Sequence, residues 1–73
     1  MHERITIEPD KMGGVPCIRG LRFPVATVLK MLAGGMTAEQ ILHEHPDLEA
    51  QDIPAVLRFA SEAVQGVDLP VLR

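Results

Sequence analysis

The sequence predicts a mainly α protein, a three-helix core containing a helix-turn-helix, with a short N-terminal strand and a β-hairpin-like segment. Apolar residues recur at helical spacing from residue 25 onward, whereas β-branched residues alternate near the N-terminus. Glycine and proline separate these segments. The chain has 73 residues, so we expect one domain over residues 1–66, followed by an extended apolar tail of residues 67–73.

Extended structure is expected in the first part of the chain. Residues 4–7, Arg-Ile-Thr-Ile, alternate with period two and predict a short strand that ends before Pro9. Residues 17–18 and 22–23 flank Gly20, a spacing that predicts a tight loop or hairpin with the glycine at its turn.

Two helices follow, separated by a glycine pair. Pro24 stands in the first turn of the first helix, where proline is tolerated, and the pair Gly34–Gly35 ends that helix by a left-handed cap. Thr37 and Gln40 form a capping-box pattern, which starts a second helix of about residues 38–45. The apolar positions of these two helices are Val25, Val28, Leu29, Leu32, Ile41 and Leu42.

The third helix is the longest, beginning within residues 49–52 and running to about Val64. Pro54 would clash with the preceding turn in a helix interior, so we expect the helix to begin late, with Gln51 or Asp52 near its cap, or to bend there. Its apolar stripe, which we expect to face the core, consists of Ile53, Val56, Leu57, Ala60, Ala63 and Val64.

Charge is unevenly distributed along the chain. The net charge is −3, which argues against holding nucleic acid by bulk charge. Residues 1–30 nevertheless carry five cationic and three acidic side chains, whereas residues 31–73 carry two and seven. The basic front half therefore allows a local anion-binding patch, although an ordinary solvated surface explains the same imbalance.

A helix-turn-helix suggests DNA binding, with the third helix in the major groove. Gln51 is suited to reading adenine, and Arg58 to contacting guanine or the backbone. The candidate DNA-contacting residues are Arg4, Arg19, Arg22, Gln51 and Arg58. The acidic start of the third helix, at Glu49 and Asp52, favours the alternative of an interaction module that never touches DNA.

Other function classes are disfavoured. His43 and His45 would point roughly 200° apart on a helix, so they cannot share a metal, and no catalytic residue, metal or cofactor is expected. No apolar run approaches the ~18 residues of a membrane span, and the N-terminus lacks the apolar region of a secretory signal. With Cys17 as the single cysteine, we expect a cytoplasmic protein.

A chain of this size with only two aromatic residues makes a marginal core, so oligomerisation or a partner protein is expected to complete it. The N-terminal strand and the tail both need something to pair with. Large apolar residues are unusual in a free terminus and mark interaction sites. The candidate partner-binding residues are Leu69, Val71 and Leu72.

Several runs together have a familiar outline: Arg-Ile-Thr-Ile-Glu-Pro at 4–9, Met-Gly-Gly-Val-Pro-Cys-Ile-Arg-Gly at 12–20, Arg-Phe-Pro-Val at 22–25, and the stretch from Leu32 to Leu42. Over about residues 3–65 the sequence resembles the bacterial family catalogued as "domain of unknown function 433". It departs from the usual pattern at Glu49, where Ser or Thr commonly caps the third helix, and at Pro54. Both departures fall at the end of that helix expected to read DNA.

This resemblance implies a homeodomain-like helix-turn-helix protein and an antitoxin of the VapB type in a type II toxin–antitoxin pair. The implied partners are a PIN-like nuclease toxin, operator DNA for autoregulation and a second copy in a homodimer. The tail would then contact the toxin or the second copy. The alternative from the residues themselves is a dimeric protein-interaction module that does not bind DNA.

Overall fold

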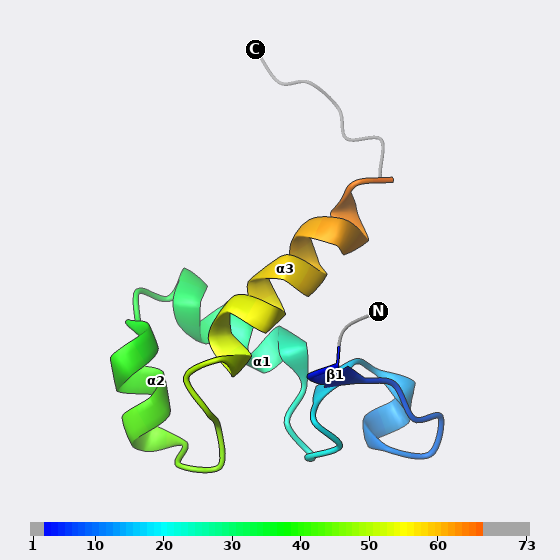
Figure 1. The fold of residues 1–73 in the computed structure, drawn as a ribbon, viewed down its shortest axis with the longest axis horizontal. Helices are drawn as coiled ribbons and strands as arrows, with labels where there is room; N and C mark the ends of the chain where they lie inside the picture. The colour runs from blue at the N-terminus through cyan, green and yellow to red at the C-terminus, as the bar shows by residue number, and fades with distance from the viewer. Residues whose placement is uncertain (1–2, 67–73) are drawn as a thin grey trace.

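The computed structural model of the chain describes residues 3–66 (Figure 1). Within them lie three α-helices and one pair of short antiparallel strands, which confirms the mainly α class. None of the helices in this part of the chain is long and apolar enough to cross a membrane. The predicted tail, with Leu69, Val71 and Leu72, falls outside the described residues.

The N-terminal strand finds its partner within the same chain. Strand β1 (Ile5–Thr6) pairs antiparallel with β2 (Cys17–Ile18), which places Ile5 opposite Ile18 and Thr6 opposite Cys17. Between them the chain forms a short 3-10 turn, η1 (Met12–Gly14). The strand is shorter than the predicted residues 4–7, and it does not depend on another molecule for pairing.

Of the tight loop or hairpin predicted around Gly20, the structure forms the tight loop. The Ile18 N–H donates to the Phe23 carbonyl over 3.0 Å, and Cys17 and Pro24 form an isolated antiparallel β-bridge. The strand that pairs with β2, however, is β1. Arg19 and Gly20 both lie in the left-handed region, with φ of 46° and 72°. A non-glycine residue in that region is uncommon, and Arg19 adopts it while its side chain binds Asp52.

Local signals set the helix limits as predicted. Helix α1 (Val25–Ala33) begins after Pro24, and Gly35 follows it in the left-handed conformation with φ of 98°. Helix α2 (Ala38–Glu44) has the complete capping box of Thr37 and Gln40. Helix α3 (Asp52–Val64) starts late, after Gln51.

Pro54 is tolerated because it lies in the first turn of α3, where the backbone N–H groups have no acceptor within the helix. The connection between α2 and α3 spans residues 45–51, whereas a helix-turn-helix commonly has a turn of about three or four residues. The α1–α2 connection spans residues 34–37 and is of that shorter kind.

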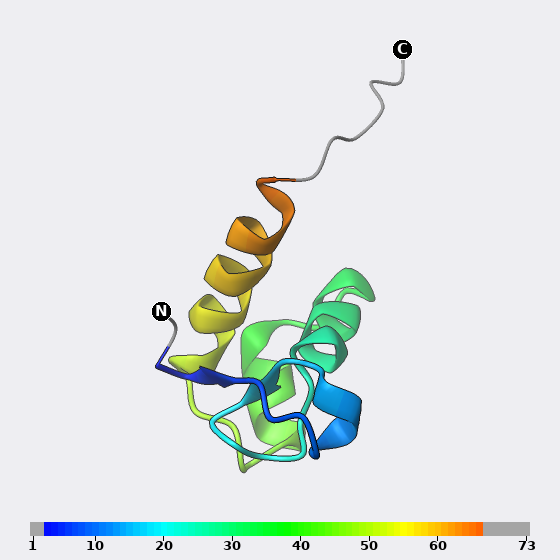
Figure 2. The ribbon, with the colours of Figure 1, turned by 90° about the vertical axis from the view of Figure 1, so that its right-hand side faces the viewer.

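The three helices and both strands share one core. Its buried apolar residues are Ile5, Ile18, Val25, Val28, Ile41, Leu48, Ile53 and Val56. The predicted stripe of α3 is only partly core, because Leu57 and Val64 are 48% and 57% exposed. For Val64 the physical reason is visible in Figures 1 and 2, where the C-terminal end of α3 projects beyond the rest of the fold.

Candidate functional site

A buried aspartate organises the start of α3. The side chain of Asp52 is fully buried and accepts hydrogen bonds from two arginines. Arg19 binds it with both sides of its guanidinium, Nε to Oδ1 at 3.1 Å and Nη2 to Oδ2 at 3.0 Å. Arg4 Nη1 donates to Oδ1 at 3.0 Å, and the Glu49 backbone N–H donates to Oδ2 at 2.7 Å. The carboxylate is thereby fully hydrogen-bonded, as a buried charge requires.

The two arginines also reach the residues around Asp52. Arg4 pairs with Glu49 Oε1 at 2.7 Å and donates to Gln51 Oε1 at 2.7 Å. Arg19 donates to the backbone carbonyl of Asp47 at 2.8 Å. We call the five residues Arg4, Arg19, Glu49, Gln51 and Asp52 the Asp52 cluster. The cluster ties the N-terminal segment and the turn after β2 to the start of α3.

The directions of the pKa shifts favour the charged forms of Asp52, Arg4 and Arg19. Burial raises the pKa of Asp52, but hydrogen bonds from Arg19, from the Glu49 backbone and from Arg4 lower it by more, so the net shift is downward. The pKa of Arg4 is raised first by its hydrogen bond to Glu49, and that of Arg19 by its hydrogen bond to Asp52. Such charge-assisted, bidentate contacts are among the stronger hydrogen bonds in proteins.

The structure therefore divides the five predicted DNA-contacting residues. Three of them lie in the Asp52 cluster. Arg4 and Arg19 both donate hydrogen bonds to Asp52, and Gln51 accepts one from Arg4. Arg22, after the turn, and Arg58, on α3, are exposed and lie outside that cluster. Two of the predicted DNA-contacting arginines, Arg4 and Arg19, are thus paired with carboxylates.

The central role of Asp52 was not predicted, because Glu49 and Asp52 were considered only as the acidic start of the third helix, with Asp52 near its cap. One signal for it was present. The basic front half and the acidic back half of the chain are complementary, so an ion pair between them was a reasonable expectation. Which carboxylate is buried, however, is decided by packing.

The lowered pKa of Asp52 makes the stability of the fold depend on pH. Because the folded state holds the proton more weakly than the unfolded chain, the stabilisation is complete above the unfolded pKa of about 3.9 and is lost as the pH falls through the folded value. We expect the melting temperature to fall below about pH 4, and to fall less steeply in Asp52→Asn. Thermal unfolding from pH 7 to pH 2 measures this, and parallel curves for the two proteins would contradict it.

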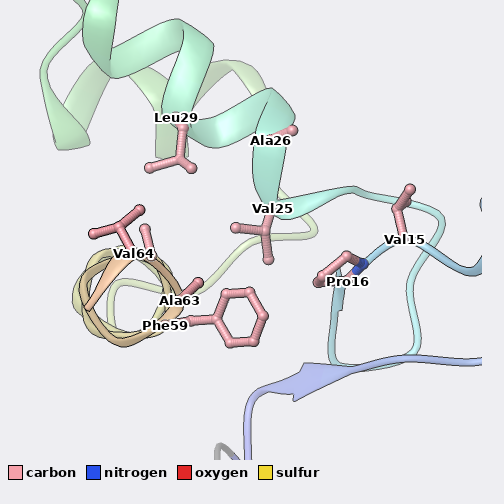
Figure 3. A pocket seen from close by; sticks show the side chains of 9 residues that line it. Val15, Pro16, Val25, Ala26, Leu29, Phe59, Ala63 and Val64 are labelled. Atoms are coloured by element: carbon pink, nitrogen blue, oxygen red, sulfur yellow. The ribbon is translucent and has the colours of Figure 1, made fainter. Parts of the chain in front are cut away.

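An apolar groove of about 310 Å³ lies between α1 and α3 (Figure 3). We call it the α1–α3 groove. Figure 3 shows Leu29 facing Val64 across it, and Phe59 and Ala63 facing Val25. The lining residues are Val15, Pro16, Val25, Ala26, Leu29, Phe59, Ala60, Ala63 and Val64.

The lining of the groove determines what it can accept. All nine side chains are apolar, so the groove offers no acid, base or nucleophile and suits aliphatic side chains. Val15 and Val64 are 42% and 57% exposed at its rim. In residues 3–66, no group of three or more His, Cys, Asp or Glu side chains is placed to hold a metal ion. The predicted apolar stripe of α3 included Ala60, Ala63 and Val64 but not Phe59. Val25 and Leu29 were predicted as apolar positions of the first helix, but not as the opposite wall of a groove.

Comparison with known proteins links the chain to a family of unknown function. The model of the family described as "Protein of unknown function (DUF433)" matches residues 5–60. The chain is 41% identical over 51 residues to the uncharacterized protein y4eO of Sinorhizobium fredii, covering 70% of this chain but only 23% of that protein. It also matches the crystal structure of a DUF433 member protein from Anabaena variabilis, with a TM-score of 0.78 and 30% identity. That match covers 82% of this chain and 59% of the other.

Proposed function

The chain belongs to the DUF433 family, and from this premise we propose that it is a non-enzymatic protein-binding module, the antitoxin of a type II toxin–antitoxin pair. The partner we propose is a PIN-like nuclease, in the reducing environment of the cytoplasm. The choice of partner rests on the resemblance to antitoxins of the VapB type. The choice of protein binding rests on the surface of the molecule.

The α1–α3 groove is the observation that carries this proposal. A continuous apolar surface on a small domain marks a site of protein–protein interaction. Here the surface is hollowed, lined by apolar side chains from two helices and a loop, and has exposed valines at its rim. Covering it with a protein segment removes that apolar area from water, which is the main favourable contribution to association.

The Asp52 cluster supports protein binding over operator binding. Arg4 and Arg19 already neutralise Asp52 and Glu49, so a phosphate would have to compete with carboxylates at about 3 Å. In a helix-turn-helix the first residues of the recognition helix contact base edges. At the start of α3, Gln51 is instead bonded to Arg4.

Mixing the purified chain with the PIN-like nuclease encoded beside it tests the function. We expect a complex in size-exclusion chromatography and loss of RNA cleavage at equimolar amounts. Val64→Asp, at the groove, is expected to weaken inhibition about 10- to 100-fold, because a charge replaces a contact worth about 1.5–3 kcal/mol. Leu57→Asp is the matched control, because Leu57 is on the same helix and comparably exposed but does not line the groove.

The absence of both a complex and inhibition at micromolar concentrations would overturn the antitoxin proposal. Equal weakening by the two substitutions would show that the groove has no special part in binding. Circular dichroism of both variants checks that they remain folded, which their exposure favours.

Operator DNA is the second candidate partner, favoured by the exposed guanidinium groups of Arg22 and Arg58. If the chain represses its own operon, Arg22→Ala with Arg58→Ala weakens binding to its promoter fragment, and the affinity of the wild type falls steeply with salt. A gel-shift titration at low salt measures this. No shift of the fragment at any protein concentration removes DNA from the function.

A further inference from the structure

We propose that residues 3–7 form a strap that opens as a unit while the three helices stay folded, and that this opening is what admits solvent to the thiol of Cys17. The N-terminal strap, as we call these residues, includes β1. Figure 2 shows it crossing the outside of the fold from a point beside the first turn of α3. The inference concerns the conformation of the chain itself and depends on neither the nuclease nor DNA.

The N-terminal strap is held by few contacts. Within residues 3–7, Ile5 is the only member of the buried core, and Ile7 is 59% exposed. The pairing of β1 with β2 involves two residues of each strand, and beyond it the Arg19 N–H donates to the Arg4 carbonyl at 2.9 Å. The Arg4 side chain binds the start of α3. A segment with so little buried apolar surface opens locally at a lower free energy than the whole domain unfolds.

Asp52 does not need Arg4 to remain paired. Without the strap, its Oδ1 still accepts from Arg19 Nε at 3.1 Å. Its Oδ2 still accepts from Arg19 Nη2 at 3.0 Å and from the Glu49 backbone N–H at 2.7 Å. The other partners of the Arg4 side chain, Glu49 and Gln51, are exposed and can be rehydrated. Opening the strap therefore leaves no buried charge unpaired, which would otherwise be a large cost of detaching Arg4.

Cys17 lies on the face of the strand pair that is turned away from the core. Successive residues of a strand point to opposite faces, and Ile5 and Ile18 both belong to the core, so Thr6 and Cys17 point to the other face. Thr6 lies directly opposite Cys17, and its hydroxyl donates to the Cys17 carbonyl at 3.5 Å. The thiol itself donates to the carbonyl of Val15, in the loop before β2, at 3.4 Å. Cys17 is only 1% exposed, and its cover is the strap and this loop rather than the helices.

The chain after the strap is fixed independently of it. The Lys11 N–H donates to the Glu8 carbonyl at 3.0 Å, and the Gly14 N–H donates to the Lys11 carbonyl at 2.9 Å. The Lys11 ammonium group donates to the Gly20 carbonyl. These bonds hold residues 8–14 against the turn after β2 and involve no residue of the strap. The strap can therefore detach by rotation of the backbone near Glu8, without loss of the turns that follow.

The rate at which the thiol reacts measures the opening. Cys17 is the single cysteine of the chain, and a buried thiol reacts when it becomes accessible. Dithiobis(nitrobenzoate), in excess at about pH 8, forms a mixed disulfide with it and releases one coloured thiolate. Urea denaturation of the same protein, followed by circular dichroism, gives the global unfolding constant.

We expect labelling to be at least about tenfold faster than global unfolding allows. It is also expected to be nearly independent of urea below the unfolding transition, because a five-residue strap exposes little surface. Labelling no faster than global unfolding allows overturns the inference. Labelling as fast as in the unfolded chain also overturns it, since the strap would then give no cover.

Three substitutions separate local opening from global unfolding. Arg4→Ala removes an anchor of the strap and is expected to speed labelling about tenfold. Arg58→Ala, the same change at an exposed position of α3, is expected to alter it by less than about twofold. Ile41→Val, in the core on α2, is expected to raise the global unfolding constant about 2- to 12-fold and labelling by less than about twofold, because α2 is folded in both forms. Equal acceleration of labelling and unfolding by Ile41→Val overturns the inference.

Hydrogen exchange of two neighbouring amides tests the strap without using the thiol. The Arg19 N–H is bonded to the Arg4 carbonyl in the strap, whereas the Ile18 N–H is bonded to the Phe23 carbonyl, which stays in place when the strap opens. After correction for intrinsic rates, we expect the Arg19 amide of the wild type to exchange at least about tenfold faster than the Ile18 amide. Equal protection of the two amides overturns the inference, whether or not Arg4→Ala folds.

Discussion

Asp52→Ala is expected to lower the free energy of unfolding by about 3–5 kcal/mol, the usual cost of removing one partner from a buried ion pair. Asp52 is fully buried and is held by Arg4, by Arg19 and by the Glu49 backbone N–H. Its removal leaves two guanidinium groups facing each other without the carboxylate between them. A domain of 73 residues has a total stability of only about 4–11 kcal/mol, so the variant is expected to lose a large share of its stability.

Urea denaturation followed by circular dichroism measures the effect. Glu49→Gln is the control, because Glu49 binds the same Arg4 but has a side chain that is 58% exposed, and an exposed pair contributes about 1 kcal/mol or less. A loss of less than about 1 kcal/mol in Asp52→Ala would mean that the cluster is not a determinant of the fold. In that case Arg4 and Arg19 would be available for another ligand.

Ile18→Ala is expected to cost about 2–5 kcal/mol, because it removes a fully buried side chain and leaves a cavity in the shared core. Ile18 lies opposite Ile5 in the strand pair and immediately before Arg19. A loosened β2 is therefore expected to weaken the contact between Arg19 and Asp52 as well. Two sites this close are not expected to be independent in a double variant with Asp52→Asn.

Ile7→Ala provides the matched control for Ile18→Ala. The residue type and the substitution are the same, but Ile7 is 59% exposed, so we expect a change within about 0.5 kcal/mol. The same denaturation measurement compares the two. Similar losses at both positions would contradict the assignment of Ile18 to the core.

The helices could be predicted because their limits depend on nearby residues. Thr37 and Gln40 are three positions apart and make both bonds of the capping box whatever lies elsewhere in the chain. Pro54 restricts the start of α3 through its own missing N–H, and it moved the start to Asp52 as expected. The strand partner was not predictable in this way, because Ile5 and Ile18 are 13 positions apart and pair only after the chain between them has folded back.

The candidate site was harder to predict because its contacts are distant in sequence. Arg4 and Asp52 are 48 residues apart, and Arg19 and Asp52 are 33 apart. Helical spacing predicted that α3 has an apolar stripe. It did not predict that the second half of α3 would form one wall of a groove opposite α1. The same arginines were therefore assigned to DNA, although three of the five predicted residues lie in the Asp52 cluster.

By itself, the sequence determined the class of the fold, the three helices and the resemblance to the DUF433 family, since periodicity, caps and short motifs act over a few residues. Only the tertiary structure decided which charges are buried together and which apolar side chains are left uncovered. The physical reason is that burial is a property of the whole packed chain. Asp52 becomes the centre of an ion-pair cluster and Val64 the rim of a groove only when α3 is placed against residues far from it in sequence.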